Sequence, residues 1–135
     1  MDIFTYGSLM FERVWSSVVR GRYGTVAASV DGFMRRRLRG ECFPALLPGG
    51  GEEAVDGVVY LGVCEEDIRR LDLFEGDYYR RKTLVCRTEC GGKINAGVYL
   101  LRRRFFPLAE CVPWSPEDFL KNDIHAFLSN PHNLD

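Results

Sequence analysis

The 135-residue sequence lacks most of the features that mark the larger functional classes of protein. No apolar run approaches the ~20 residues that a membrane-spanning helix requires, and the first residues show neither a basic leader nor an apolar signal core. Eighteen Lys and Arg stand against nineteen Asp and Glu, a net charge of −1, so no overall basic field favours nucleic acid or anionic lipid. We therefore expect a soluble, cytoplasmic protein that binds a small molecule, with no nucleic-acid or membrane partner.

Residues that bind metals or act as nucleophiles are also scarce. Of the five cysteines, only Cys86 and Cys90 lie close together, at a C-x3-C spacing that is unusual for zinc, and both histidines are far from them. An odd number of cysteines in largely apolar surroundings indicates reduced thiols and no metal site. None of the cysteines has an activating neighbour, and Ser8 lacks the G-x-S-x-G context of a hydrolase nucleophile.

Length and pattern predict one α+β domain over residues 1–135. A chain of this length can bury roughly two thirds of the surface that its unfolded form exposes, which is enough for one core. Strand-like composition marks 2–6, 55–63 and 79–88, and a Gly-rich turn at 90–93 joins the last of these to 94–101. Helical spacing or capping signals mark 11–21, 65–74 and 115–128, the last stopping before Pro131.

The segments between these elements are less regular. Glycines at 32 and 40 predict an irregular or bulged strand within 24–40, and prolines and glycines predict an irregular segment around 45–47, ending at Gly49-Gly50-Gly51. Strands outnumber helices and do not alternate regularly with them. The pattern therefore favours a small, mixed, strongly curved sheet or closed β-barrel with a few flanking helices.

The first candidate site is the strand-loop-helix junction Tyr6-Gly7-Ser8-Leu9-Met10. Glycine lets the backbone turn sharply and approach a ligand closely, and free N–H groups at a helix start can face a carboxylate or a polarised carbonyl. The alternative is an ordinary glycine turn in which Ser8 caps the helix.

The second candidate is Glu75, which helical spacing places on the apolar stripe of Ile68 and Leu71. Desolvation raises the pKa of a carboxyl group toward the range that general acid/base catalysis uses. The alternative is a solvated residue at the helix end before Gly76, paired with Arg80 or Arg81.

Two further acids and two basic clusters compete for a role. Asp72 and Asp77 flank Glu75, and Asp72 lies about 60° further round the helix, as 3.6 residues per turn require. The clusters at 35–39 and 102–104 could contact RNA or phosphate. Dispersed acids and the lack of interleaved aromatic residues argue against nucleic-acid binding.

Four motifs in order resemble a known family: Tyr6-Gly7-Ser8-Leu9, Phe43-Pro44-Ala45, Val55-x-Gly57-x-Val59-Tyr60, and Leu71-Asp72-x-Phe74-Glu75-Gly76-x-x-Tyr79-x-Arg81. The set is similar to the gamma-glutamylcyclotransferase-like family, within it the gamma-glutamylaminecyclotransferase and plant avirulence-induced-like branch. The resemblance covers about residues 2–101 and implies a small mixed β-barrel.

The resemblance also implies a reaction. In this family the α-amine of a γ-glutamyl unit attacks its own γ-carbonyl, releasing 5-oxoproline and a free amine without metal or cofactor. It implies that Glu75 is the general acid/base, and that substrate is bound by Tyr6, Gly7, Ser8, Leu9, Tyr79 and Arg81. For Arg81 the alternative is that it pairs with an acid outside the site. Whether Arg80 or Arg81 matches the family position stays open, as do the leaving amine and the oligomeric state. The alternative is a non-catalytic domain of the same fold that binds a small metabolite or peptide.

Overall fold

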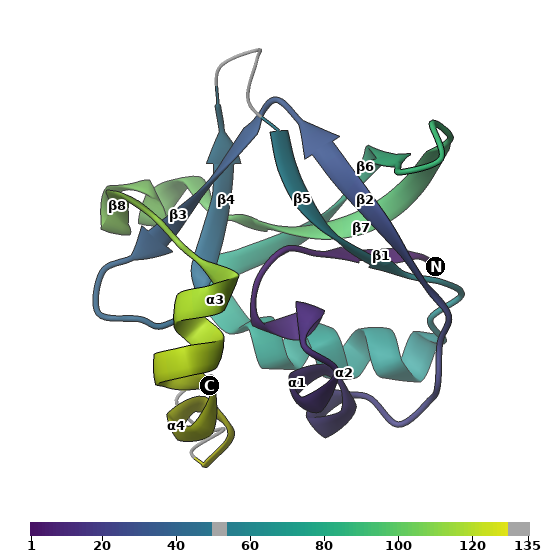
Figure 1. Ribbon diagram of the computed structural model, residues 1–135, viewed down its shortest axis with the longest axis horizontal. Helices are drawn as coiled ribbons and strands as arrows, with labels where there is room; N and C mark the ends of the chain where they lie inside the picture. Colours follow the sequence, from purple (N-terminus) through teal and green to yellow (C-terminus); the bar gives the residue numbers. More distant parts are fainter. Residues whose placement is uncertain (50–53, 130–135) are drawn as a thin grey trace.

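The computed structural model, which describes residues 1–49 and 54–129, is built around a closed five-stranded barrel (Figure 1). The barrel order is β1 (Ile3–Thr5), β5 (Ala54–Tyr60), β2 (Thr25–Asp31), β6 (Tyr79–Thr88) and β7 (Lys93–Leu101). Neighbours pair antiparallel, except that Ile3 of β1 pairs parallel with Gly97 of β7 and so closes the barrel. This architecture confirms the predicted α+β class with a closed sheet.

A second sheet of three strands, in the order β4-β3-β8, packs beside the barrel (Figure 1). The prediction of a single strand over 24–40 is wrong, because Gly32, at φ +81°, separates β2 from β3 (Phe33–Leu38). The predicted irregularity is present in β3, whose register with β8 (Ala109–Pro113) shifts between Arg36 and Leu38. The segment expected to be irregular is strand β4 (Pro44–Pro48), whose two prolines lie at its ends, where a missing N–H is tolerated. Gly50 and Gly51, part of that expectation, lie outside the described residues.

The helices lie outside the barrel, as predicted. A 3₁₀ turn (Ser8–Met10) leads to α1 (Glu12–Val18), and α1 packs against α2 (Glu65–Glu75) beneath the barrel (Figure 1). The C-terminal helix has three parts: α3 (Pro116–Asp118), a π-helical turn (Phe119–Asp123) and α4 (Ile124–Ser129). Ser115 caps it by accepting from the Asp118 N–H, as predicted, whereas Pro131 lies outside the described residues. Within the described ranges no helix is long and apolar enough to cross a membrane.

Two 3₁₀ turns and one strand have no counterpart in the sequence-based expectations. The first turn (Gly76–Tyr78) joins α2 to β6. A 3₁₀ turn (Arg103–Leu108) follows β7 and leads into β8 (Ala109–Pro113), the outer strand of the second sheet. Charged residues and a proline interrupt any regular hydrophobic spacing over 103–113. No periodic pattern therefore predicts the turn after β7 or strand β8.

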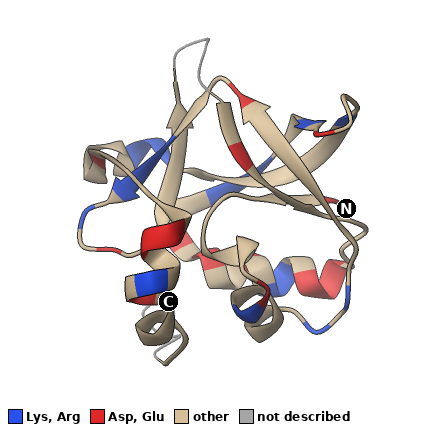
Figure 2. Ribbon diagram, in the orientation of Figure 1, with Lys and Arg blue, Asp and Glu red and all other residues tan. Residues whose placement is uncertain are grey.

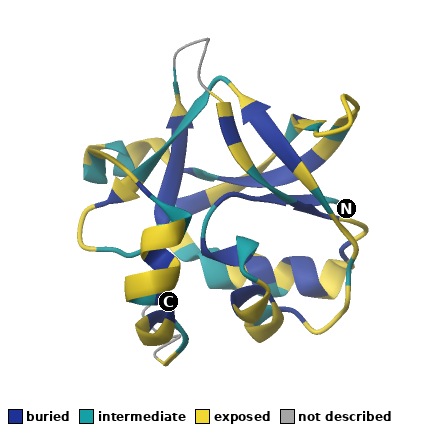
Figure 3. Cartoon of the chain, viewed as in Figure 1, coloured by how far each residue is buried: buried dark blue, intermediate teal, exposed yellow. Residues whose placement is uncertain are grey.

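Strand β1 is buried on both faces, and the loop that follows it is placed by this burial (Figure 3). Ile3 belongs to the cluster under the helices, whereas Phe4 packs inside the barrel. Gly57 of β5 lets β1 approach, since a Cβ at this position would lie 2.1 Å from the Thr5 carbonyl oxygen. The Thr5 hydroxyl donates to the Val58 carbonyl at 2.8 Å, which satisfies the buried polar group.

The N-terminal end of α2 is fixed by a buried carboxylate. Asp67 is 1% exposed and accepts from the N–H groups of Arg20 and Gly21 at 3.0 and 2.9 Å. The Tyr23 hydroxyl and the Arg70 guanidinium each donate to it at 2.5 Å. Burial alone would raise the pKa of Asp67, but these four donors outweigh burial and hold the pKa below its usual range.

Candidate functional site

A cavity of about 320 Å³ lies between the loop after β1 and the C-terminal end of α2. Its size is at the lower end of small-molecule pockets, roughly 300–1,000 Å³. Six of the seven predicted site residues line it: Tyr6, Gly7, Ser8, Leu9, Glu75 and Tyr79. Its other lining residues are Phe4, Thr5, Phe43, Pro44, Phe74, Gly76, Asp77, Tyr78, Tyr99, Phe105 and Phe127.

The loop Tyr6–Leu9 turns more tightly than predicted. At Gly7 a Cβ would lie 2.8 Å from the Pro44 ring, so the loop contacts β4 only because this residue is glycine. The N–H groups of Met10 and Phe11 bond to the carbonyls of Gly7 and Ser8, forming a 3₁₀ turn. Helix α1 begins at Glu12 with Phe11 as its N-cap, close to the predicted start at residue 11, and the alternative in which Ser8 caps a helix is wrong.

The amides of this loop are available to a ligand. The first hydrogen bond of the 3₁₀ turn is donated by the Met10 N–H. The Ser8 and Leu9 N–H groups come before it in the chain and take no part in the hydrogen bonds of the turn. Both residues are buried and line the cavity. Together they form a concave backbone surface that can donate to a carboxylate or an oxyanion.

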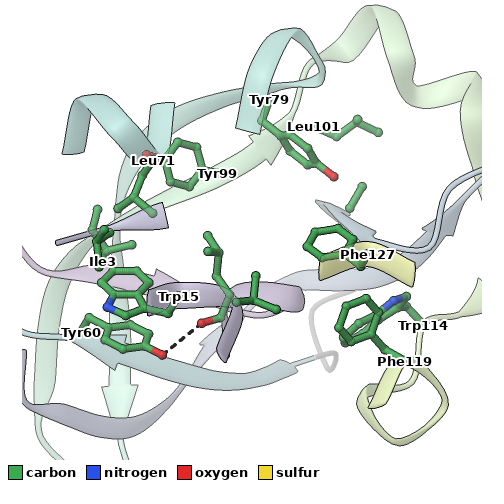
Figure 4. Packing of buried hydrophobic residues seen from close by; sticks show 14 of the residues in the cluster. Ile3, Trp15, Tyr60, Leu71, Tyr79, Tyr99, Leu101, Trp114, Phe119 and Phe127 are labelled. Carbon is green, nitrogen blue, oxygen red and sulfur yellow. Dashed lines mark hydrogen bonds between the residues drawn. The ribbon is translucent and has the colours of Figure 1, made fainter. Parts of the chain in front are cut away.

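Aromatic packing holds the loop from behind. The Tyr60 hydroxyl donates to the Leu9 carbonyl at 3.1 Å (Figure 4). Trp15 of α1 stacks on the Tyr60 ring with centroids 3.5 Å apart and 5° between the ring planes. These contacts couple the loop to α1 and β5, and they restrict its motion.

Arg35 supports the same loop, a role that the sequence reasoning missed. Its guanidinium donates to the Tyr6 carbonyl at 2.8 Å and lies 5.3 Å from the centroid of the Trp114 ring. Burial lowers the pKa of Arg35 below its usual value. The Arg-rich run on β3 (Figure 2) thus supplies a structural anchor, and its sequence carries no local signal for a contact with a residue 29 positions away.

Glu75 is the last residue of α2, and Gly76 ends the helix with φ +69°. Burial, with the negative charge of Asp72 as the second cause, raises the pKa of Glu75 to about 8. The sequence left open that Glu75 pairs with Arg80 or Arg81. Pairing with Arg81 is wrong, because the Arg81 Nε and Nη2 donate to Asp72 at 3.0 and 3.3 Å. No ion pair involves Glu75 within the described part of the chain.

Asp72 is engaged elsewhere. Tyr99 donates its hydroxyl to Asp72 at 2.6 Å, beside the two bonds from Arg81. Burial would raise the pKa of Asp72, but these hydrogen bonds outweigh it and keep the pKa below its usual value. Neither Arg81 nor Asp72 is among the described residues that line the cavity, so Arg81 is connected to it through Asp72 and the lining residue Tyr99. Asp77 lines the cavity but is exposed.

Tyrosines form the remaining polar wall. Tyr6 donates to the Tyr99 carbonyl at 2.5 Å and Tyr79 donates to the Pro44 carbonyl at 2.6 Å. Burial, together with the nearby charge of Glu75, raises the pKa of both phenols above the usual value, so they stay neutral. Figure 4 shows the Tyr79 ring projecting from β6 among the buried side chains.

The cysteines lie away from the cavity. None of the five lines it, all are free thiols, and burial raises the pKa of Cys86 to about 11. Among residues 1–49 and 54–129, no three His, Cys, Asp or Glu side chains cluster as potential metal ligands.

The raised pKa of Glu75 predicts a pH-dependent stability. An unfolded glutamate titrates near 4.5, so between that pH and about 8 the folded state keeps a proton that the unfolded state releases. Compared with Glu75→Gln, the wild-type free energy of unfolding should therefore fall as pH rises through this window, by at most about 1.4 kcal/mol per pH unit. Urea unfolding of both proteins at pH 5, 7 and 9 measures the difference. If the free energies of unfolding of the wild type and Glu75→Gln changed with pH in parallel, the raised pKa of Glu75 would be contradicted.

Comparison with known proteins adds a second line of observation. Residues 3–118 match the family model described as gamma-glutamyl cyclotransferase, AIG2-like. The chain is similar to AIG2-like protein C of Arabidopsis thaliana, 31% identical over 131 residues, which cover 95% of this chain and 74% of the relative. Six further AIG2 or AIG2-like proteins of that plant match at 27–31% identity, and the chain spans 48–60% of their length.

Solved structures share the fold. A gamma-glutamyl cyclotransferase superposes with a TM-score of 0.69 at 16% identity, covering 100% of this chain and 88% of the other. An AIG2-like protein from Mus musculus superposes with a TM-score of 0.61 at 25% identity, covering 85% and 95%.

Proposed function

Because the chain belongs to the gamma-glutamyl cyclotransferase, AIG2-like family, we propose that it is an enzyme that converts a γ-glutamyl amine or peptide into 5-oxoproline and a free amine. One observation supports this proposal above the others: a carboxyl group with a pKa of about 8 shares a small cavity with a loop of available backbone amides. A protein that only binds anions gains nothing from a carboxylate in its pocket.

In the proposed mechanism, Glu75 moves the proton. The substrate α-amine is protonated at neutral pH and attacks only after it loses a proton, which the Glu75 carboxylate accepts. The amine nitrogen then bonds to the γ-carbonyl carbon, and the bond from that carbon to the leaving nitrogen breaks. As the ring forms, the attacking nitrogen loses its second proton. Glu75 passes both protons in turn to the leaving nitrogen, which departs as an ammonium ion, so the carboxylate is regenerated and no cofactor is consumed.

Binding and charge stabilisation fall to the loop. We assign the substrate carboxylate and the developing oxyanion to the backbone N–H groups of Gly7, Ser8 and Leu9, with Tyr6 and Tyr79 as neutral walls. Because nucleophile and electrophile belong to one molecule, the pocket chiefly holds the folded-back conformer, where effective molarities reach roughly 10⁵–10⁸ M. A nucleophilic side chain is therefore unnecessary.

The geometry gives Arg81 an indirect part in this scheme. Its guanidinium keeps Asp72 ionised, and the negative charge of Asp72 contributes to the raised pKa of Glu75. We therefore assign Arg81 a positioning role through Asp72, in agreement with the alternative that it pairs with an acid and not with the substrate.

The proposal is tested by incubating the protein with γ-glutamyl amines and γ-glutamyl dipeptides and measuring 5-oxoproline. We expect product from at least one substrate class. If every substrate binds to the protein but none is converted, the protein is the non-catalytic binding domain of the alternative hypothesis. A sample of the Glu75→Gln variant, prepared in the same way, controls for contaminating activity.

A further inference from the structure

One part of the cavity wall is aromatic and is not used by the chemistry above. Five rings come from five separate segments: Phe43 before β4, Phe74 on α2, Tyr78 before β6, Phe105 in the turn after β7, and Phe127 on α4. Four of them are only half-buried, whereas Tyr6, Ser8 and Leu9 at the loop are buried. The cavity therefore has a polar end at the loop and an aromatic end with exposed ring surface.

The rings support one another at fixed angles. Tyr78 meets Phe105 at a centroid distance of 5.0 Å and an interplanar angle of 75°. Phe74 meets Phe127 at 6.1 Å and 70°, and Phe43 meets Tyr78 at 6.1 Å and 55°. Edge-to-face pairs of this kind are favourable geometries, so the aromatic end is preformed.

Charge at the aromatic end is limited. Among the described lining residues only Glu75 and Asp77 carry carboxyl groups, and Asp77 is exposed to solvent, which screens it. The Arg104 guanidinium lies 4.9 Å from the Phe105 ring centroid, so one ring already has a cationic partner. Besides Asp77, two acids lie near these rings: Glu75, which burial keeps largely protonated at neutral pH, and the half-buried Glu41 beside Tyr78. No Lys or Arg is among the described lining residues, and ring surface suits an apolar group.

We propose that the aromatic end receives the leaving group, and that the substrates are γ-glutamyl amides of apolar amines, above all amines that carry an aromatic ring. This inference rests on the proposed function, because it assigns the two ends of the same cavity to the two parts of one substrate. Phe127 brings the C-terminal helix into this part of the cavity, beyond residues 3–118 that match the family model.

The test compares γ-glutamyl phenethylamide, γ-glutamyl methylamide and the γ-glutamyl amide of a diamine. We expect kcat/KM for the phenethylamide to exceed that of either other substrate by about tenfold or more, since a buried apolar group discriminates by this order. In Phe105→Ala the ratio of phenethylamide to methylamide should fall about three- to tenfold. Phe106→Ala is the matched control, because this neighbouring ring is also half-buried but does not line the cavity.

Binding separates this inference from the proposed function. Calorimetric dissociation constants of the three amides for Glu75→Gln measure the preference without turnover. If the phenethylamide binds more tightly but the wild-type protein forms no 5-oxoproline from any of the three amides, the proposed function is overturned and the aromatic subsite is supported. Equal binding, or a preference for the diamine amide, would overturn the subsite assignment even if 5-oxoproline forms. The subsite assignment would also be overturned if Phe106→Ala lowered the ratio of phenethylamide to methylamide kcat/KM as far as Phe105→Ala does.

Discussion

Glu75→Gln is expected to lower kcat for 5-oxoproline release at least about 10²-fold, the lower range for loss of a general acid/base group. Glutamine keeps the size of the side chain but cannot accept the proton of the α-ammonium group. KM should change much less, because we assign the substrate carboxylate to the loop amides. The variant should also be no less stable than the wild type at pH 7, since it removes a carboxyl whose ionisation is opposed by burial.

The pH dependence gives an independent readout. A carboxyl with a pKa of about 8 is mostly protonated at pH 7, so wild-type kcat/KM should rise with pH and level off above about 8. In Glu75→Gln, the residual kcat/KM on the same substrate should no longer show the part of this rise that comes from ionisation of Glu75. The substrate amine titrates identically in both assays, so the difference between the profiles reports the enzyme.

Two other variants complete the test. Glu65→Gln makes the same chemical change on an exposed residue of the same helix and should leave kcat unchanged. Asp77→Asn removes the other carboxyl that lines the cavity. If Asp77→Asn loses as much turnover as Glu75→Gln, or if Glu75→Gln keeps wild-type turnover, the assignment of the base to Glu75 is wrong.

Asp67→Ala is expected to lower the free energy of unfolding by about 1–3 kcal/mol, the range for leaving hydrogen-bonding groups without their partner. Four donors would lose their acceptor at once: two backbone amides, the Tyr23 hydroxyl and the Arg70 guanidinium. Asp67 itself is only 1% exposed, whereas these hydrogen bonds are part-buried, so the donors regain some contact with water in the variant. Chemical unfolding at pH 7 measures the loss.

The pH dependence of this effect has the opposite sign to that of Glu75. The pKa of Asp67 is lowered in the folded state, so its contribution is present above the unfolded pKa and is lost as pH falls. The gap between wild type and Asp67→Ala should therefore narrow below about pH 4. Glu65→Ala, on the exposed face of the same helical turn, should change stability by less than about 0.5 kcal/mol. A gap that is equally small for both variants would remove Asp67 as the anchor of α2.

Asp67 also shows where reading one helix from its pattern was incomplete. Helical spacing predicts a buried carboxyl at Glu75, because this residue lies on the same face of the helix as Ile68 and Leu71. Asp67 lies four residues before Leu71, so the same spacing places it on that face, and it is buried more deeply than Glu75. Asp67 also lies in the acidic first turn of the helix, where acidic residues are common because they interact favourably with the helix N-terminus. That common role explains its presence equally well, so the sequence does not distinguish it as a buried residue.

The sequence by itself determined the features that depend on neighbouring residues. The hairpin of β6 and β7 follows from its Gly-rich turn, in which Gly91 adopts φ +87°. The end of α2 follows from Gly76, and this position sets Glu75 at the last helical turn. Turn and capping preferences act within a few residues, so they can be read locally.

Only the tertiary structure decided which distant residues meet. Gly32 divides what reads as one strand between two sheets, and Arg35, which reads as part of a basic cluster, becomes an anchor of the Tyr6 carbonyl. Arg81 pairs with Asp72, and Phe127 of α4 reaches the cavity from far along the chain. These contacts depend on sheet order and helix packing over long sequence separations, and one-dimensional periodicity does not encode the partner of a side chain.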